Sequence, residues 1–332
     1  MRAMLLETPA HAPEAALRAI DVPDIPPRED ELAVRISACG VCRTDLQICT
    51  GDLAARRLPI VPGHQIVGVV EEVGARVTGW AAGDRVGVAW LASACGTCAY
   101  CSSGRENLCA SARFTGWDQD GGYATRCTVR ADFALRLPGG FSDEALAPLL
   151  CGGVIGYRAL RVSGIQPGGR LGLYGFGASA LLTIQVARHW GCDVYVCTRS
   201  IKEQARARSL GAVWTGAYDD SPPIGLDAAI TFAPAGSVVA RALKSLTRGG
   251  TVAINAIHLD QVPALEYEDL WWERSIRSVA NYTRRDAQEF LELAATVPLR
   301  ATFETHPLEA ANTALDRLAR GITDGAVVLL AR

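Results

Sequence analysis

Short apolar runs separated by glycines fill the first half of the chain. Between residues 30 and 140 the sequence contains ELAVRI, IVGVVEEVG, DRVGVAW and YATRCTV, which are rich in β-branched residues. Runs of this length bounded by glycine are typical of strands and turns. The glycines that punctuate them are Gly63, Gly68, Gly74, Gly79, Gly83 and Gly87. This pattern predicts an irregular, barrel-like β domain rather than a parallel sheet.

A different rhythm begins near residue 152. The segment RLGLYGFGASALLTIQVARHWG contains an apolar strand, a glycine turn and an amphipathic helix. The strands DVYVCTRS, GLDAAITFA and TVAINAI then alternate with the helices IKEQARARSLGA and SVVARALKSLTRGG. Such alternation predicts right-handed crossovers and a doubly wound parallel sheet, so the fold class is α/β. After residue 285, two further helices and a closing strand, AVVLLA, are expected.

Composition and charge exclude some classes of partner. The 332 residues carry a formal net charge of −2, and 49% are hydrophobic, as in an ordinary globular enzyme of about two domains. No block of like charges suggests nucleic acid, and no apolar run approaches the ~20 residues that span a bilayer. The N-terminal segment lacks the apolar core of a signal peptide. We therefore expect a cytoplasmic protein with no nucleic-acid or membrane partner.

Four cysteines lie close together in CGTCAYCSSGRENLC: Cys95, Cys98, Cys101 and Cys109. Disulfides are disfavoured in a reducing compartment, and the total of eleven cysteines is odd. An iron–sulfur cluster usually needs other spacings, and four unliganded surface thiols would be prone to oxidation. The two-residue gaps let neighbouring thiolates reach one cation, which favours a tetrahedral zinc site. A zinc ion with four sulfur ligands has no open position, so this site would be structural.

A second set of soft ligands is scattered along the chain. Cys42 lies in CGVCRTD, His64 in PGHQIVG and Cys151 in PLLCGG. Each has an ordinary alternative, as a packed thiol or a satisfied loop histidine. Together they form the two-cysteine, one-histidine set that leaves zinc a fourth position for water or an alcohol oxygen.

The turn YGFGASA has the spacing of a dinucleotide-binding fingerprint. Alone the motif is weak, but here a strand precedes it, a helix follows, and the next strand ends about 20 residues later. The free N–H groups at the start of the helix would bind pyrophosphate. The residues expected to contact the cofactor here are Gly175, Phe176, Gly177, Ala178, Ser179 and Ala180.

The end of the next strand indicates which cofactor binds. An NAD enzyme usually places an acidic residue there for the ribose 2′-hydroxyl, whereas this chain has Thr198, followed by Arg199 and Ser200. Arg199 and the two hydroxyls would suit a 2′-phosphate, with Lys202 assisting. The alternative is that Arg199 is only a solvated surface cation. We favour NADP(H) over NAD(H).

These motifs, in their order and spacing, resemble the zinc-dependent medium-chain alcohol dehydrogenases over essentially the whole chain. The resemblance implies a GroES-like catalytic domain at residues 1–151 with 286–332, and a Rossmann domain at 152–285. It also implies a homodimer or homotetramer. The pieces that carry it are GVCRTD, PGHQIVGVVEEVG, GDRVGV, CGTCAYCSSGRENLC, GGYAT, APLLCGGVIGYRAL, YGFGASA and GAVVL.

By resemblance, Cys42, His64 and Cys151 would bind a catalytic zinc, and the four clustered cysteines a structural zinc. Thr44 would exchange the hydroxyl proton, unless it is an ordinary loop hydroxyl. Asp45 would orient the imidazole of His64, unless it only caps a helix. Further along the chain, Ala256 and Asn281 would lie near the nicotinamide.

Three positions depart from the family pattern. Gln65 follows the zinc-binding histidine where many relatives have Glu, and Gln47 replaces a histidine that continues the proton relay in some. Ala326 stands where a basic residue often lies near the cofactor phosphate. Neither glutamine removes a metal ligand. The uncharged Gln65 would leave the zinc in a more positive field, which would alter product release or favour reduction, and with Gln47 protons would leave by water or another route. At Ala326 the contact with the cofactor phosphate is not expected.

The substrate pocket is the least specified part. Gln47, Trp90 and Trp117 are candidate lining residues, with Leu91 and Tyr123 as further candidates, but aromatic residues here are equally suited to the core. The resemblance also extends to a bacterial branch of zinc alcohol dehydrogenases, which does not define a substrate. With no extra acid or histidine to bind a polyol, an apolar alcohol or aldehyde is the better expectation.

The leading hypothesis is therefore a zinc-dependent oxidoreductase. It would transfer hydride between NADP(H), or secondarily NAD(H), and a small alcohol, aldehyde or ketone whose oxygen zinc polarises. One alternative is a reductase of C=C or C=N bonds on the same scaffold. Another is a non-catalytic cofactor-binding protein.

Overall fold

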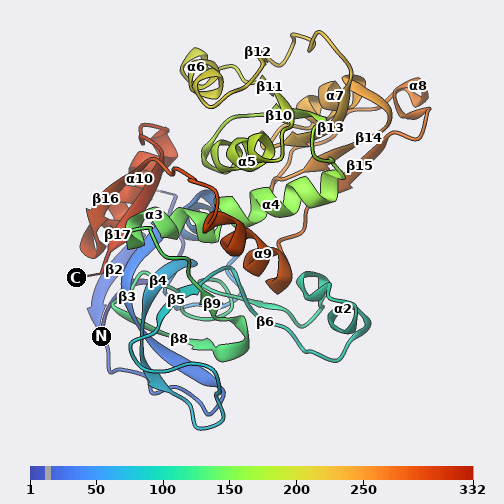
Figure 1. Ribbon diagram of the computed structural model, residues 1–332. Helices are drawn as coiled ribbons and strands as arrows, with labels where there is room; N and C mark the ends of the chain where they lie inside the picture. Colours follow the sequence, from blue (N-terminus) through green and yellow to red (C-terminus); the bar gives the residue numbers. More distant parts are fainter. Residues whose placement is uncertain (12–15, 332) are drawn as a thin grey trace. The chain divides into compact units, whose positions relative to one another are not determined.

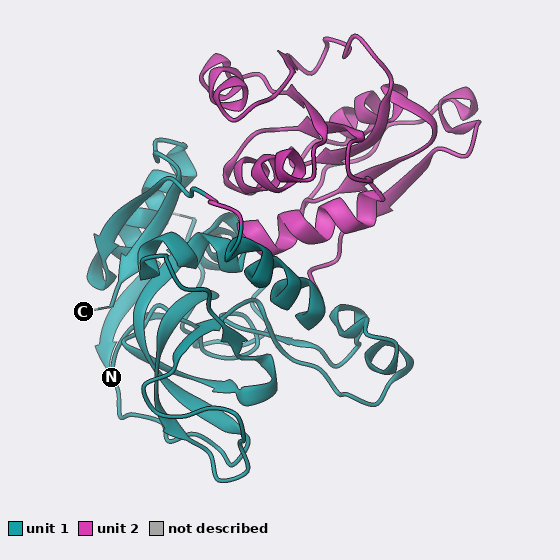
Figure 2. Ribbon diagram, viewed as in Figure 1, with its two compact units in different colours: residues 1–151, 283–296, 300–332 teal, residues 152–282, 297–299 magenta. Residues whose placement is uncertain are grey.

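The structure of the protein is a computed structural model that describes residues 1–11 and 16–331. Figure 1 labels its elements, and Figure 2 colours the two compact units into which the chain divides. Unit 1 comprises residues 1–151, 283–296 and 300–332, and unit 2 comprises residues 152–282 and 297–299. The second segment of unit 1 thus begins at Thr283, three residues before the boundary expected at residue 286.

Short strands make up most of unit 1. They are β1 (Arg2–Leu6), β2 (Leu17–Asp21), β3 (Glu31–Val41), β4 (Gln65–Val73), β5 (Arg85–Val88), β6 (Leu91–Ser93), β7 (Arg113–Phe114), β8 (Arg126–Arg130), β9 (Leu135–Arg136), β16 (Phe303–Pro307) and β17 (Ala326–Leu330). The main sheet has the order β16-β17-β3-β4-β5-β9, and β8 also pairs with β3. All of its pairs are antiparallel except β16–β17. The expectation of a β-rich domain of short strands is confirmed.

Helices and 3₁₀ turns connect the strands of unit 1. They are α1 (Arg43–Thr50), α2 (Ala99–Ser102), α3 (Asp143–Leu146), α9 (Arg284–Ala294) and α10 (Ala311–Arg320), with 3₁₀ turns η2 (Glu106–Leu108), η3 (Ala131–Phe133), η4 (Ala147–Leu150) and η5 (Leu308–Ala310). Helix α10 buries Ala311, Ala314 and Leu315, whose spacing of three and four places them on one face. That face belongs to the main apolar core of the unit.

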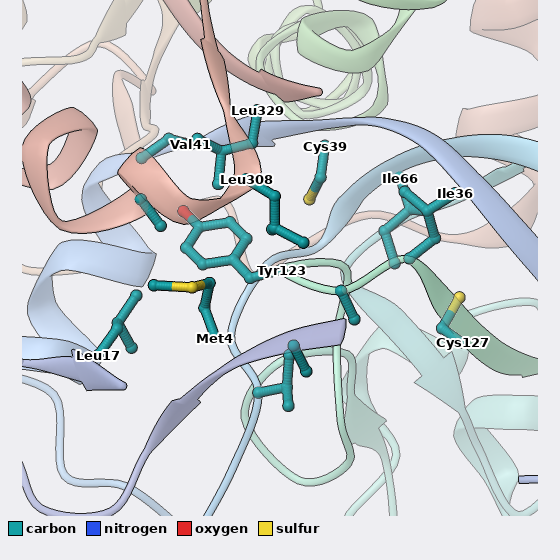
Figure 3. Packing of buried hydrophobic residues seen from close by; sticks show 14 of the residues in the cluster. Met4, Leu17, Ile36, Cys39, Val41, Ile66, Tyr123, Cys127, Leu308 and Leu329 are labelled. Carbon is teal, nitrogen blue, oxygen red and sulfur yellow. The ribbon is translucent and has the colours of Figure 1, made fainter. Parts of the chain in front are cut away.

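Tyr123 lies inside this core rather than at a pocket surface. Figure 3 shows its side chain in the cluster that also contains Met4 and Leu308. The residue is fully buried, and its hydroxyl has no hydrogen-bond partner among the described residues. Leu91, 2% exposed, is also buried.

Unit 2 is a six-stranded parallel sheet with the order β12-β11-β10-β13-β14-β15. Numbered from β10, this is the order 3-2-1-4-5-6 of the doubly wound dinucleotide-binding fold, which confirms the expected fold class. The strands are β10 (Arg170–Tyr174), β11 (Asp193–Cys197), β12 (Trp214–Gly216), β13 (Leu226–Thr231), β14 (Leu246–Ile254) and β15 (Ser275–Ser278). The helices are α4 (Gly152–Ser163), α5 (Ala178–His189), α6 (Ile201–Ser209), α7 (Gly236–Lys244) and α8 (Tyr267–Leu270).

Residues 143–163 form one nearly continuous helical run through α3, η4 and α4. Contrary to the expectation from sequence, this run of 21 residues is long and apolar enough, by composition, to cross a membrane. However, 61% of its most apolar window is buried inside the protein. In α4, Gly156 allows close packing on α5, because a β-carbon there would clash with Thr183. The run is therefore accounted for as core helix.

Candidate active site

Three soft ligands from distant parts of the sequence converge in unit 1. Cys42 lies between β3 and α1, His64 precedes β4, and Cys151 follows η4. Their ligand atoms all lie within 4.8 Å of one another, and Cys42 Sγ is 3.4 Å from His64 Nε2. Donors around a tetrahedral zinc ion lie about 3.5–3.8 Å apart, given bond lengths of ~2.0–2.3 Å. The three donors therefore fit such an ion, with one coordination position left open.

Asp45 both caps a helix and orients the histidine. Its Oδ2 accepts the backbone N–H of Cys42 at 2.9 Å, forming a capping box at the start of α1. Its Oδ1 lies 3.0 Å from His64 Nδ1, and both residues are almost completely buried. With Nδ1–H donated to this carboxylate, Nε2 keeps its lone pair for a metal. Burial raises the pKa of Asp45, and the charge of His64 opposes that effect.

The pKa values of the Cys42 and Cys151 thiols are shifted in opposite directions. The Cys151 thiol donates to Cys42, which lowers the pKa of Cys42 well below its usual range although burial opposes the shift. The same hydrogen bond, with burial, raises the pKa of Cys151. The backbone N–H of Thr44 also donates to Cys42 Sγ, at 3.3 Å. The site thus already stabilises one thiolate, the form that binds metal.

The two glutamines that depart from the family pattern occupy different environments. Gln65, the first residue of β4, is 4% exposed and packs over Gly40, where a β-carbon would clash with its side chain. Gln47 lies in α1, and its Oε1 is buried without a hydrogen-bond partner in the described part of the chain. A buried acceptor of this kind calls for a donor, such as water or a ligand hydroxyl.

A stack of rings begins at His64. Trp90 meets the His64 ring edge-on, with centroids 4.8 Å apart, and stacks on Phe114 at 5.2 Å and Trp117 at 5.7 Å. The Arg56 guanidinium lies 3.9 Å from the Trp117 ring centroid. Trp90 therefore borders a candidate metal ligand, whereas Trp117 lies further out in the stack. Phe114 and Arg56 were not identified from the sequence, because their roles depend on this tertiary stacking.

The four clustered cysteines converge around a separate point in unit 1. Their sulfurs all lie within 4.8 Å of one another, with Cys95 at 3.8 Å and Cys98 at 3.6 Å from Cys101. Sulfurs of a tetrahedral zinc–thiolate site lie about 3.8 Å apart, so the set fits a fully coordinated ion. Backbone N–H groups of Thr97 and Cys98 lower the pKa of Cys95 to about 6.

An ion pair between the buried Glu106 and the partly exposed Arg284 anchors the segment that carries these cysteines. Glu106, 5% exposed in η2, accepts the backbone N–H of Arg284 at 2.9 Å and its Nε–H at 3.3 Å. Arg284 also donates to the carbonyl oxygen of Asp132 at 3.2 Å. This connection between the cysteine segment and the start of α9 was not apparent from the sequence, since 178 residues separate the partners.

In unit 2, the glycine turn between β10 and α5 has the geometry its sequence requires. Gly175 has φ +91, and a β-carbon there would meet the backbone of Ala233. Gly177 is the N-cap of α5, and a β-carbon there would meet nothing within 4 Å, so the backbone is open to a ligand. Ala180 is fully buried. Phe176, Ala178 and Ser179 complete the turn and the first residues of α5.

Comparison with known proteins identifies the family. Residues 28–139 match the family model described as the alcohol dehydrogenase GroES-like domain, and residues 179–296 match that described as zinc-binding dehydrogenase. The chain is 51% identical to "Probable alcohol dehydrogenase AdhA" of Mycobacterium tuberculosis over 310 residues, covering 92% of this chain and 90% of that protein. The chain belongs to the zinc-dependent medium-chain alcohol dehydrogenase family.

Other alcohol dehydrogenases match over similar lengths. One from Geobacillus stearothermophilus is 38% identical over 308 residues, covering 90% of this chain and 91% of the relative. Among solved structures, AibC superposes with a TM-score of 0.91 at 27% identity, covering 99% and 95% of the two chains. A thermostable alcohol dehydrogenase from Pyrobaculum aerophilum, solved with cobalt and zinc bound, has a TM-score of 0.89 at 25% identity and covers 99% of both chains.

In the present chain, the residues that follow β11 form hydrogen bonds with one another. Thr198 is buried, and its hydroxyl donates to Glu203 Oε2 at 2.5 Å. Ser200 is the N-cap of α6 and accepts the N–H of Glu203 at 3.3 Å. Arg199 and Lys202 are both exposed. Glu203 was missed from the sequence, although Ser-x-x-Glu is a recognisable capping-box pattern.

The carboxyl ends of β13, β14 and β15 carry the residues expected near the nicotinamide. Ala256 follows β14, and Asn281 follows β15 with φ +60. The Nδ2 of Asn281 is buried without a partner among the residues that the structure describes, as is Oγ1 of Thr231 at the end of β13. Dinucleotides bind at the carboxyl edge of such sheets, so these unpaired groups lie at the edge where a cofactor would contact them.

Proposed function

We propose that this dehydrogenase transfers hydride between NADP(H), in preference to NAD(H), and a small apolar alcohol, aldehyde or ketone, using a zinc ion held by Cys42, His64 and Cys151. The observation that carries the proposal is the convergence of these three side chains, with the Asp45 carboxylate behind the imidazole. A bound zinc would act as a Lewis acid that lowers the pKa of an alcohol or polarises a carbonyl. The relative from Pyrobaculum aerophilum that was solved with cobalt and zinc supports this metal.

The surrounding residues have distinct roles in the proposed reaction. Asp45 fixes the tautomer and ring orientation of His64, so that Nε2 faces the metal. Thr44, whose backbone is tied to the Cys42 sulfur, places its hydroxyl to exchange the substrate proton. Trp90, edge-on to His64, supplies an apolar wall that favours an apolar substrate and excludes water.

Proton release follows a route that differs from that of relatives with a histidine at position 47. Gln47 cannot accept and release a proton at neutral pH, but its buried Oε1 can orient a water molecule. We propose that water carries the proton from Thr44 past this residue. Gln65 is neutral where many relatives have Glu, so it would add no negative charge beside a bound metal, which would favour reduction of a carbonyl.

The four clustered cysteines are proposed to hold a second, structural zinc ion. Their sulfur spacing fits a saturated tetrahedral site, and Glu106 fixes the same segment to α9. We further propose a cytoplasmic homodimer or homotetramer, with β15 as the pairing edge, because this strand is the last of its sheet and exposes Arg277 and Ser278.

Hydride transfer and metal content, measured together, test the proposal. Purified protein should contain zinc and oxidise NADPH in the presence of apolar aldehydes, and removing the metal with a chelator should abolish turnover. Reduction of an activated C=C or C=N bond that continues after metal removal would instead favour the alternative reductase. Bound zinc and cofactor without turnover on any substrate of the panel would indicate a non-catalytic protein.

A further inference from the structure

Glu203 brings a carboxylate to the end of β11, although the residues immediately after that strand are not acidic. The residue immediately after the strand is Thr198, but its hydroxyl donates to Oε2 of Glu203, five residues later in the first turn of α6. Thr198 is itself held in place, since its N–H donates to Gly216 and its carbonyl accepts from Gln204. The side chain of Glu203 is therefore fixed within one hydrogen bond of the strand end.

The opposite charges of Arg199 and Glu203 both act on Tyr218. The Arg199 guanidinium lies 5.9 Å from the ring centroid of Tyr218. Burial raises the pKa of Tyr218, while Arg199 lowers it and Glu203 raises it, which places both charges within reach of the same ring. A 2′-phosphate bound by Arg199 would therefore meet the negative charge of Glu203.

The donors available to a 2′-phosphate are fewer than the sequence indicates. The hydroxyl proton of Thr198 is already donated to Glu203, so Thr198 cannot also donate to phosphate. Ser200 accepts from Glu203 through its oxygen but keeps its own proton for donation. Arg199 and Ser200, with Lys202 nearby in sequence, favour phosphate binding after β11, and Glu203 opposes it.

We propose that Glu203 is a cofactor-specificity residue: its carboxylate, held by Thr198, accepts a hydrogen bond from the ribose 2′-hydroxyl of NAD(H) and repels the 2′-phosphate of NADP(H). This inference rests on the proposed use of a nicotinamide dinucleotide. Glu203 limits the preference for NADP(H) that Arg199 creates, and it keeps NAD(H) as a working cofactor. The acidic group common in NAD enzymes is thus supplied from the following helix instead of the strand end.

Two variants separate the effect of the negative charge of Glu203 from the effect of the hydrogen bond that positions its side chain. Glu203→Gln removes the charge but keeps an oxygen that can accept from Thr198, and Thr198→Val keeps the charge but removes the donor that holds it. Glu268→Gln is the matched control, because it removes one exposed carboxylate from α8, which precedes the edge strand β15 and lies on the opposite side of unit 2 from α6 (Figure 1). Dissociation constants for NADPH and NADH would be measured by nicotinamide fluorescence on the metal-loaded full chain.

The expected result is a change in opposite directions for the two cofactors. In Glu203→Gln, NADPH should bind more tightly and NADH more weakly, so that their affinity ratio changes on the order of tenfold. In Thr198→Val, NADH should bind more weakly while NADPH changes little, and Glu268→Gln should leave both unchanged. A merely structural role for Glu203 would weaken both cofactors together.

Three results would overturn the inference, and they have different consequences for the proposed function. If both cofactors bind the unmodified enzyme but Glu203→Gln and Thr198→Val leave the ratio unchanged, the specificity role is wrong and the proposed function stands. If Glu203→Gln does not fold, an unchanged NADH affinity in Thr198→Val is sufficient to overturn it. If the unmodified enzyme binds neither cofactor, the proposed function fails and this inference fails with it.

Discussion

Asp45 lies behind His64, with its Oδ1 3.0 Å from the ring Nδ1, and its other carboxylate oxygen accepts the N–H of Cys42. One buried carboxylate therefore positions two of the three candidate metal ligands. The second of these bonds also starts α1, the helix that carries Thr44 and Gln47. A change at Asp45 should consequently alter metal binding before it alters the fold.

Replacing Asp45 by Asn tests this relationship. The amide oxygen can still accept one hydrogen bond, but the negative charge facing His64 is lost. We expect zinc affinity and kcat/KM to fall by about 10- to 100-fold, as for other residues that orient metal ligands. Zinc retention during dialysis against a chelator would measure the first quantity. Asp52→Asn, at an exposed position two residues after the end of α1, is the control; equal retention in the two variants would contradict the role of Asp45.

Loss of individual cysteines should separate the two proposed metal sites. Cys151→Ser should abolish hydride transfer and remove roughly one zinc per chain with little loss of thermal stability. Cys101→Ser should also remove roughly one zinc but lower Tm, because the cysteine segment would lose its cross-link. Elemental analysis and thermal unfolding would measure both. Cys192→Ser, at a buried cysteine outside both clusters, should keep full metal content; identical metal loss in all three would argue against two sites.

The aromatic stack gives a prediction about the substrate. Trp90→Ala removes the ring that meets His64, so KM for apolar aldehydes should rise, with kcat/KM falling on the order of tenfold. Trp90→Phe should retain most activity because an apolar ring remains. Trp80→Phe changes a tryptophan that packs under Arg136 instead, and it should leave the kinetics unchanged. A Trp90→Ala enzyme with unchanged KM across a series of aldehydes would exclude this wall from the substrate site.

Arg199 provides a direct test of the proposed cofactor preference. Arg199→Asp should shift the ratio of catalytic efficiencies toward NADH, on the order of tenfold or more, because a cation for the 2′-phosphate becomes an anion. Arg199→Lys keeps the positive charge and should retain most of the preference. Initial rates with each reduced cofactor would be compared at matched aldehyde concentration. The same ratio in the Asp and Lys variants would show that Arg199 is a solvated surface cation.

Glu304 should make acid stability depend on one ion pair. Hydrogen bonds from Arg317, assisted by His306, lower the pKa of Glu304 from its ordinary 4.5 to about 2. Since the folded value is the lower one, the carboxylate stabilises unit 1 above about pH 4.5, and this contribution is lost as pH falls toward 2. After allowance for solvent screening it is worth about 1 kcal/mol.

Chemical unfolding at several pH values would measure that contribution. Glu304→Gln should lower the unfolding midpoint at pH 6 and have little effect near pH 2, where the native carboxyl is itself becoming protonated. Glu292→Gln, at an exposed position of α9, should not change the pH profile. Parallel profiles for the native chain and Glu304→Gln over the whole range would contradict this assignment.

The sequence specified the sheet types well because they depend on local periodicity. Alternating strands and helices after residue 152 predicted the parallel sheet, and the order of its strands confirms it. The glycine fingerprint was equally local, since φ +91 at Gly175 is a requirement of the turn itself. By contrast, the expectation that no apolar run approaches membrane-spanning length was wrong for residues 143–163. The apolar character of this run reflects burial in the protein.

Tertiary contacts account for what the sequence did not indicate. Arg56 and Phe114 join the stack at Trp90 only because separate loops fold together, and no spacing in the chain signals it. The pairing of Glu106 with Arg284 has the same origin. Glu203 is an intermediate case. Its capping-box pattern can be recognised in the sequence, but its hydrogen bond with Thr198 depends on how α6 packs against the end of β11. The roles assigned to the metal ligands and cofactor contacts remain predictions.

The pairing of β17 with β3 affects the order in which parts of the chain can fold during synthesis. Val41 lies opposite Val327, so the strand that leads into Cys42 acquires this neighbour only after residues 152–282 of unit 2 have been translated. The nucleotide-binding sheet, encoded in between, can form earlier. During synthesis, β3 therefore completes its sheet only after the intervening segment of unit 2 has been translated.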